Sequence, residues 1–127
     1  MNFALSDAES FLEKWKNKAL NNPHIKTIFC PSFTELFAIA DILKTSSAML
    51  GAQNVFYENT GAYTGEVSCK MLKETGCQWV LIGHSERRSI LCETDEMIQK
   101  KLKPNYTLYF QIDLMVNGLI KTMKIRL

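Results

Sequence analysis

Short apolar runs alternate in this sequence with segments of helical periodicity, and this alternation is the strongest constraint on the fold. Three runs, at residues 25–30, 48–53 and 77–83, are rich in aliphatic, aromatic and β-branched side chains, which is typical of strands. Apolar residues recur at helical spacing before, between and after these runs. Strands that alternate with helices usually pair in parallel, so the sequence predicts an α/β protein.

Polar residues mark where several helices are expected to begin. Ser6 with Glu9, and Ser32 with Glu35, have the spacing of a capping box, in which each side chain accepts a hydrogen bond from a backbone N–H. Thr94 is the expected cap of a further helix, whose first residues are acidic and whose last are lysines. That order of charges suits the helix dipole.

Composition limits the possible classes of function. A chain of 127 residues with 46% hydrophobic and 22% charged residues has the length and make-up of one globular domain. A net charge of +2, with lysines spread along the chain, argues against a nucleic-acid partner. No apolar run approaches the roughly 18 residues of a membrane span, and the first residues lack the features of a signal peptide. We therefore expect a cytoplasmic protein with no membrane partner.

The four cysteines are irregularly spaced, at Cys30, Cys69, Cys77 and Cys92. No CxxC or CxxH pair occurs, and the two histidines, His24 and His84, are far apart in sequence. This pattern argues against a zinc site and favours buried or reduced thiols. No metal and no cofactor are predicted.

The densest cluster of chemically active side chains follows the third apolar run, in the segment VLIGHSERRS at residues 80–89. His84 is the first residue after the predicted strand, and ligand sites of parallel α/β proteins lie at the carboxyl ends of the strands. Residues 85–88 can begin a short helix, whose backbone N–H groups would disfavour a histidine cation. A neutral His84 can donate a hydrogen bond to a carbonyl, and the adjacent Glu86 can carry a proton or anchor a cation.

Two arginines follow, and they need anionic partners. The nearest candidates in sequence for Arg87 and Arg88 are Glu66 and Glu93. An alternative remains on physical grounds alone. In it, His84 is a hydrogen-bonded structural residue at a strand end, and the segment after it is a solvated turn held by salt bridges.

Four segments, GAQNV, GAYTGEVS, WVLIGHSERR and ETDEMIQKKL, occur in this order and closely resemble the triosephosphate isomerase family. The resemblance extends to about residue 103. It implies that residues 1–103 form part of a (β/α)₈ barrel, with a leading helix and three complete β/α units. Residues 104–127 form an atypical tail, in which 106–112 reads as a strand, and they resemble sequence from another reading frame or an unrelated exon.

The resemblance implies the chemistry of the site. In that family a glutamate base moves a proton between adjacent carbons of a triose phosphate through an enediolate, and a neutral histidine polarises the carbonyl, both established properties. His84 matches the histidine electrophile, and Glu86 is the acid next to it. The reaction interconverts glyceraldehyde 3-phosphate and dihydroxyacetone phosphate, without a metal or cofactor.

The resemblance also implies a homodimer. The segment around residues 61–66 matches the family's interdigitating loop, whose tip enters a pocket beside the partner subunit's active site, and Thr64 is the expected tip. Arg87 is expected to pair with Glu66 in the scaffold around that interface. The further positions that match the interface are Gln53, Asn54, Tyr63 and Gly65.

Several family elements have no counterpart in these 127 residues. The missing elements are a strand ending in Asn-x-Lys, the glutamate base, the lid and the phosphate-binding loops. The resemblance therefore implies a chain that is inactive by itself. The alternative is a non-enzymatic fragment or interaction module that pairs with an intact isomerase through the Tyr63–Thr64 loop.

Overall fold

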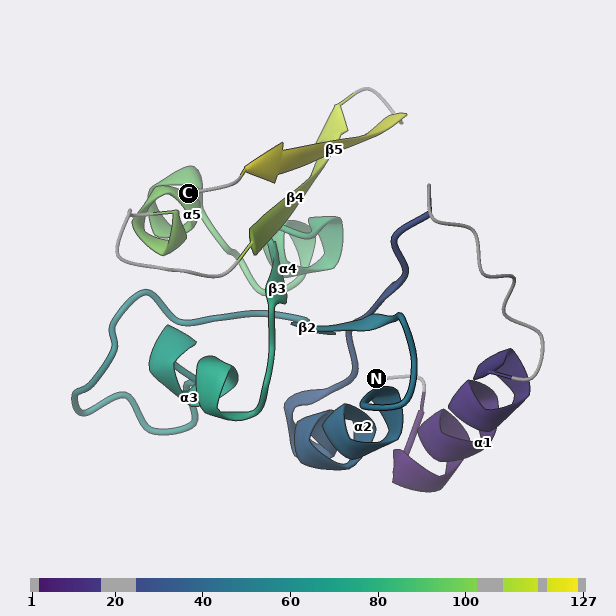
Figure 1. Ribbon diagram of the computed structural model, residues 1–127. Coiled ribbons are helices and arrows are strands. Elements are labelled where there is room, and N and C mark those ends of the chain that lie inside the picture. The colour runs from purple at the N-terminus through teal and green to yellow at the C-terminus, as the bar shows by residue number, and fades with distance from the viewer. Residues whose placement is uncertain (1–2, 17–24, 103–108, 117–118, 126–127) are drawn as a thin grey trace.

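The computed structural model describes residues 3–16 and 25–102 with their side chains, and 109–116 and 119–125 by their backbone (Figure 1). The described elements, in chain order, are α1 (Leu5–Lys16), β1 (Ile28–Phe29), the 3₁₀ turn η1 (Phe33–Glu35), α2 (Leu36–Leu43), β2 (Met49–Ala52), α3 (Cys69–Glu74), β3 (Trp79–Ile82), α4 (Ser85–Ser89), α5 (Asp95–Lys101), β4 (Tyr109–Val116) and β5 (Leu119–Ile125).

The strands form a sheet in the order β1-β2-β3-β4-β5. The first four pair in parallel with their neighbours in the chain, as the alternation of strands and helices predicts. The order follows the sequence, so each new strand is added on the same side of the growing sheet, which is how a (β/α)₈ barrel is built. The α/β prediction is confirmed, and the architecture fits part of such a barrel.

One apolar core joins the helices to the sheet. Leu12 of α1, Ile39 of α2 and Leu72 of α3 lie in the same buried cluster as Val80 and Ile82 of β3. Figure 1 shows α1 and α2 side by side under β1 and β2, with α4 and α5 beside β3 and β4. Because the helices cover the strands, the predicted strands are nearly all apolar.

Two of the predicted helix starts are wrong in detail. In α1 the carboxylate of Asp7 accepts the N–H of Ala4 at 3.1 Å, so Asp7 takes the role predicted for Glu9, and Ser6 lies inside the helix. At the second predicted box, Ser32 precedes η1 without a side-chain capping bond, and its hydroxyl contacts Thr34 Oγ1 at 2.9 Å. Glu35 is buried there instead of capping the turn.

The cap at Thr94 is confirmed. Its hydroxyl oxygen accepts the N–H of Met97 at 3.3 Å, and α5 begins at the next residue. Ser68 caps α3 in the same way, by accepting the N–H of Met71 at 3.3 Å. Both serve helices of only six or seven residues, in which a single cap satisfies a large share of the free backbone donors.

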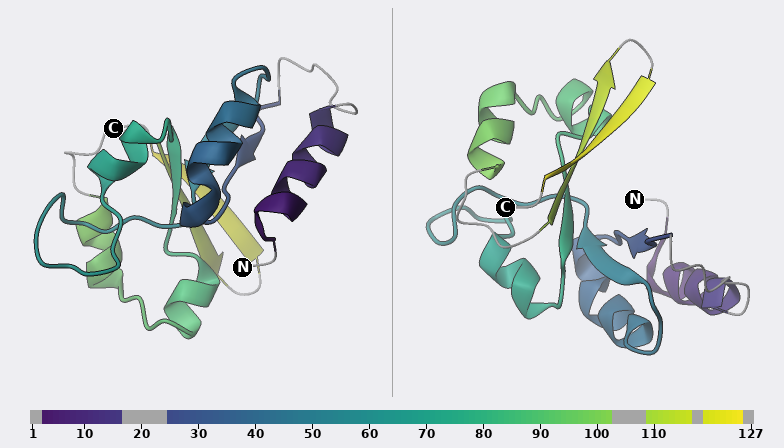
Figure 2. Two further views of the ribbon diagram at one scale, coloured as in Figure 1. Left: turned by 90° about the horizontal axis from the view of Figure 1, so that it is seen from below. Right: turned by 45° about the horizontal axis from the view of Figure 1, so that its top comes forward.

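The tail contains a strand where one was predicted, although its limits differ. The prediction covered residues 106–112, whereas β4 spans Tyr109–Val116, and residues 103–108 lie outside the described part. β5 runs antiparallel to β4, with Val116 opposite Leu119. Figure 2 shows this hairpin projecting from the body of the molecule. A sheet that was parallel up to β4 therefore ends in an antiparallel edge.

Cysteine burial is mixed. Cys69 and Cys77 are buried, Cys30 is partly exposed, and Cys92 is exposed in a left-handed backbone conformation with φ 54°. Burial raises the pKa of the Cys69 and Cys77 thiols above its ordinary value. Within residues 3–16 and 25–102, no helix combines the length and apolarity that crossing a membrane requires.

Candidate functional site

The turn after β3 places the histidine. Gly83 has φ +69°, which L side chains rarely adopt, and a Cβ there would lie 3.0 Å from Ile98 Cδ1. Glycine therefore suits this position for two reasons, backbone conformation and close packing against α5. The turn takes the chain directly from the end of the buried strand into α4, with His84 between them at the carboxyl end of the sheet.

His84 is the N-cap of α4, and its Nδ1 accepts the N–H of Glu86 at 3.3 Å. An imidazole nitrogen that accepts a hydrogen bond carries no proton, so the proton of the neutral ring is on Nε2. The side chain is 35% exposed, so part of the ring can meet a ligand. The prediction that residues 85–88 begin a short helix is confirmed. The backbone N–H of Glu86 in the first turn of this helix fixes the tautomer of the neutral His84 ring.

Glu86 lies in the first turn of the same helix. Its carboxylate is 3.8 Å from His84 Nδ1 and is 77% exposed. A carboxylate in this position suits the positive end of the helix dipole. The site thus combines a hydrogen-bond donor on one ring nitrogen with an adjacent solvated acid.

Arg88 holds the joint between β3 and α4. Its Nε donates to the carbonyl oxygen of Gly83 at 3.1 Å, and its Nη1 donates to Asp95 Oδ1 at 2.7 Å. Its partner is therefore Asp95 at the start of α5, and neither Glu66 nor Glu93. These two contacts tie the residue before His84 to the helix that packs against the turn.

A buried polar cluster lies behind the site. Glu93 and Lys101 form an ion pair with both side chains at most 3% exposed, and Lys101 also donates to Asn54 Oδ1 at 2.6 Å. Arg87 Nε lies 3.3 Å from the second carboxylate oxygen of Glu93. Neither of these two atoms has a hydrogen bond within residues 3–16 and 25–102, so their contact is that of an ion pair.

This cluster gives Arg87 one of the two partners that the sequence offered, Glu93, while the interface pairing of Arg87 with Glu66 stays a prediction. Arg87 pairs with Glu93 within the described chain, whereas Glu66 is exposed. Glu93 has almost no exposure, and a buried carboxylate gains more from a neighbouring cation than a solvated carboxylate such as Glu66 does. Burial also lowers the pKa of Lys101, and the hydrogen bond and charge of Glu93 oppose that shift. Sequence reasoning missed Lys101, although its position three residues after Ile98 placed it on the buried face of α5.

The loop between β2 and α3 has internal support. Its base is closed by a hydrogen bond from Phe56 N to Val67 O at 2.8 Å, and its tip by one from Glu66 N to Tyr63 O at 3.0 Å. The rings of Phe56 and Tyr63 are tilted, with centroids 4.7 Å apart. Gly61 has φ +140°, and a Cβ there would lie 2.5 Å from the Tyr63 ring. The loop is therefore shaped by contacts among its own residues.

The remaining predicted residues fall into two groups. Thr64, Gly65 and Glu66 are exposed on the loop tip, and Gly65 has φ +92°. Gln53 is exposed after β2, and its Nε2 donates to the carbonyl oxygen of Cys30 at 2.9 Å. Asn54 is buried and bound by Lys101, which fits a scaffold role.

Comparison with known proteins decides the family. The family profile described as Triosephosphate isomerase matches residues 1–112. The chain is 44% identical over 103 residues to a triosephosphate isomerase from Endomicrobium trichonymphae, covering 81% of this chain and 41% of that protein. It is 48% identical over 103 residues to one from Dehalococcoides mccartyi, covering 81% and 40%.

The chain belongs to the triosephosphate isomerase family.

A third relative, the triosephosphate isomerase of Dictyoglomus thermophilum, is 45% identical over 98 residues, covering 77% of this chain and 39% of its own length. The chain therefore spans about two-fifths of the length of the curated triosephosphate isomerases that it matches. The family match also continues to residue 112, nine residues beyond the segment whose resemblance was evident from motifs. Within the described residues, the match includes the first half of β4, the fourth parallel strand.

Proposed function

We propose that this chain supplies the electrophile of a triosephosphate isomerase site, with His84 as the residue that polarises the substrate carbonyl. The observation that carries the proposal is the hydrogen bond from Glu86 N–H to His84 Nδ1. It leaves Nε2–H as the donor on a neutral ring at the carboxyl end of β3. A donor aimed at a carbonyl oxygen stabilises the negative charge that develops in an enediolate.

Glu86 has the secondary role in this proposal. Its solvated carboxylate, 3.8 Å from the ring, can exchange a proton near the reacting atoms. The substrates are glyceraldehyde 3-phosphate and dihydroxyacetone phosphate, and the names of the relatives support this assignment. With it we propose the family's place in glycolysis and gluconeogenesis, a homodimer and a cytoplasmic location.

A graft tests the role of His84. Residues 3–102 of this chain replace the corresponding segment of the Dictyoglomus thermophilum isomerase, and kcat is measured with and without H84Q. Loss of a preorganised donor to a developing oxyanion lowers kcat by about 10²–10³-fold. The matched control is K70Q, at an exposed lysine of α3, which we expect to leave kcat unchanged. Full activity of the H84Q graft would show that His84 is not the electrophile.

The 127-residue polypeptide assayed alone is a second arm of that experiment. We expect no isomerase activity above background, since base, electrophile and phosphate clamp act as a unit and their effects are not separable. Activity in this polypeptide that disappears with H84Q would contradict its proposed inactivity and support the role of His84.

The second candidate function is an interaction module. Tyr63 favours it, because its ring is 44% exposed and yet held in place by Phe56 and by the backbone at Gly61. A loop with a fixed shape loses little entropy when it docks. In this proposal the Tyr63–Thr64 loop pairs the chain with an intact isomerase.

Mixing tests the interaction module. A large excess of the chain is incubated with an intact isomerase, and we expect activity to fall as mixed dimers form. The variant G61V, which would displace the Tyr63 ring, should abolish the effect. Unchanged activity at every ratio would exclude this function.

A further inference from the structure

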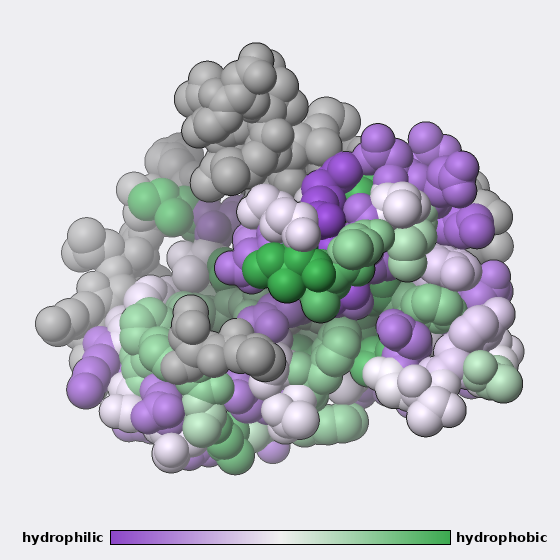
Figure 3. Space-filling view, turned by 180° about the vertical axis from the view of Figure 1, so that it is seen from behind, coloured by the Kyte–Doolittle hydropathy of each residue, from purple (hydrophilic) through white to green (hydrophobic). Residues whose placement is uncertain are grey.

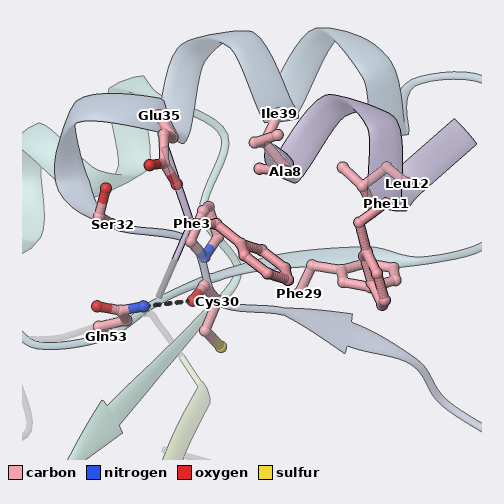
Figure 4. Close-up of a pocket in the computed structure, with 11 residues that line it drawn as sticks. Phe3, Ala8, Phe11, Leu12, Phe29, Cys30, Ser32, Glu35, Ile39 and Gln53 are labelled. Carbon is pink, nitrogen blue, oxygen red and sulfur yellow. Dashed lines mark hydrogen bonds between the residues drawn. The ribbon is translucent and has the colours of Figure 1, made fainter. Parts of the chain in front are cut away.

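A pocket of about 290 Å³ opens between α1, the end of β1 and the start of α2. Figure 4 shows its two contrasting sides. Phenylalanine rings form a row along one wall, and the carboxylate of Glu35 points into the same space from the beginning of the helix. None of these side chains belongs to the site around His84, so the pocket requires its own explanation.

Glu35 is the unusual residue in this pocket. It is 6% exposed, and within residues 3–16 and 25–102 no side chain or backbone group forms a hydrogen bond or ion pair with its carboxylate. The nearby hydroxyl of Ser32 contacts Thr34 Oγ1 at 2.9 Å. A carboxylate enclosed in this way is poorly hydrated, and in proteins such groups are normally paired or ligated.

The opposite wall is aromatic. The centroids of Phe3 and Phe11 are 5.7 Å apart, and Phe11 meets Phe29 edge-on at 6.2 Å. The rings of Trp15 and Phe29 also meet edge-on, with centroids 4.9 Å apart. Phe3 and Phe11 are about half exposed, at 51% and 46%. Burial of such rings by an apolar ligand is favourable, and aromatic faces also attract cations.

We propose that this pocket binds a small organic amine, with its ammonium group on Glu35 and its apolar body against Phe3, Phe11 and Phe29. The volume suits a body of about one ring, at the small end of ligand pockets. An ammonium supplies the missing partner of the carboxylate, and the body covers the exposed rings. An amino acid is excluded as the ligand because its own carboxylate would repel Glu35.

Other ligand classes fit less well. A magnesium or calcium ion needs about six oxygen ligands, whereas apolar side chains predominate in this lining. A neutral apolar molecule would exclude water from the Glu35 carboxylate without offering it a hydrogen-bond donor. A triose phosphate is anionic and would be repelled. The amine site is thus independent of the proposed isomerase function.

The test compares two ligands of one shape. Benzylammonium and benzyl alcohol are titrated into the 127-residue chain at neutral pH, and binding is followed by the NMR signals of Phe3, Phe11 and Ile39. A charge-assisted hydrogen bond makes the amine bind about tenfold more tightly than the alcohol. The variant E35Q keeps the shape of the side chain and should remove that tenfold preference.

The matched control is E13Q, which makes the same change of net charge on an exposed residue of α1. We expect E13Q to bind benzylammonium as the unmodified chain does. Equal affinity of the unmodified chain for the two ligands would overturn the proposal without reliance on any variant. Unchanged amine affinity in E35Q, or shifts spread over the whole surface, would overturn it as well.

Discussion

At the level of single residues, buried charge is the dominant feature of this chain. Lys101 and Glu93 pair in the core, Asn54 accepts a further hydrogen bond from Lys101, and Arg87 lies within ion-pair distance of Glu93. Such a group is strongly interdependent, because removal of one member leaves another charged and buried. Since Arg87 belongs to α4, the cluster also fixes the helix that begins at His84. The proposed electrophile, His84, is therefore positioned in part by a charge cluster that is anchored through Arg87 of the same helix.

Replacement of Lys101 tests this dependence. K101M leaves Glu93 with Arg87 as its one remaining cationic partner among residues 3–16 and 25–102, and we expect a loss of about 3–5 kcal/mol in the free energy of unfolding at neutral pH. Urea unfolding followed by circular dichroism measures it. The double variant E93L/K101M, which removes both buried charges, should recover part of the loss. Equal stability of K101M and the unmodified chain would show that the pair contributes nothing.

The pH dependence of stability has a definite sign. Burial lowers the pKa of Lys101 in the folded chain below its ordinary value of 10.5. Between that lowered pKa and 10.5 the unfolded chain binds more protons, so the free energy of unfolding rises with pH in this window. The E93L/K101M variant should lack that rise, whereas an exposed K70M variant should keep it.

At the level of secondary-structure elements, the joint between β3 and α4 is the critical one. Gly83 provides both the left-handed backbone and the space that Ile98 of α5 occupies. Arg88 then closes the joint by bonding to the Gly83 carbonyl oxygen and to Asp95. A strand, a turn and two helices are thus locked together around His84, the residue for which we propose the chemical role.

Two alanine substitutions separate the effects of backbone conformation and of close packing at Gly83. Gly76 has φ +87° with nothing within 4 Å of an added Cβ, so G76A measures the backbone term alone, about 1–2 kcal/mol. In G83A the new methyl group also meets Ile98 at 3.0 Å. We expect G83A to lose about 1 kcal/mol more of the free energy of unfolding than G76A does. Equal unfolding free energies for the two variants would mean that α5 yields to the methyl group without cost.

At the level of the whole molecule, the described surface has features that favour association. β1 and β5 are the two edges of the described sheet, and strand edges offer unpaired backbone groups. Phe37, Ile90 and Leu91 are exposed by 69%, 72% and 58%. Figure 3 shows apolar side chains gathered near the middle of the rear face. Apolar side chains and open edges together make self-association favourable.

Sedimentation velocity at several concentrations tests this expectation. We expect the 127-residue chain to sediment as a concentration-dependent mixture, with a broad thermal transition. The substitutions F37K and I90K, on exposed residues outside the described core, should shift the mixture toward monomer. A monodisperse monomer with one sharp cooperative transition would contradict the expectation.

Local features of this chain were predictable from sequence. The order and type of the elements up to α5, the cap at Thr94 and the place of His84 at a strand end depend on interactions within a few residues. Periodicity and capping chemistry report such interactions directly. The capping boxes at Ser6 and Ser32 failed for a related reason: spacing alone does not decide which of several polar residues, such as Asp7, reaches the backbone.

The tertiary structure decided which charged and polar side chains pair with one another. Lys101 donates to Asn54, which lies 47 positions earlier in the sequence, and the buried Glu93 is the carboxylate that pairs with Arg87 within the described chain. The burial of Glu35 and the antiparallel direction of β5 likewise depend on which surfaces meet after the helices pack. Desolvation of a charge is a property of that packing, so no local pattern in the sequence encodes it.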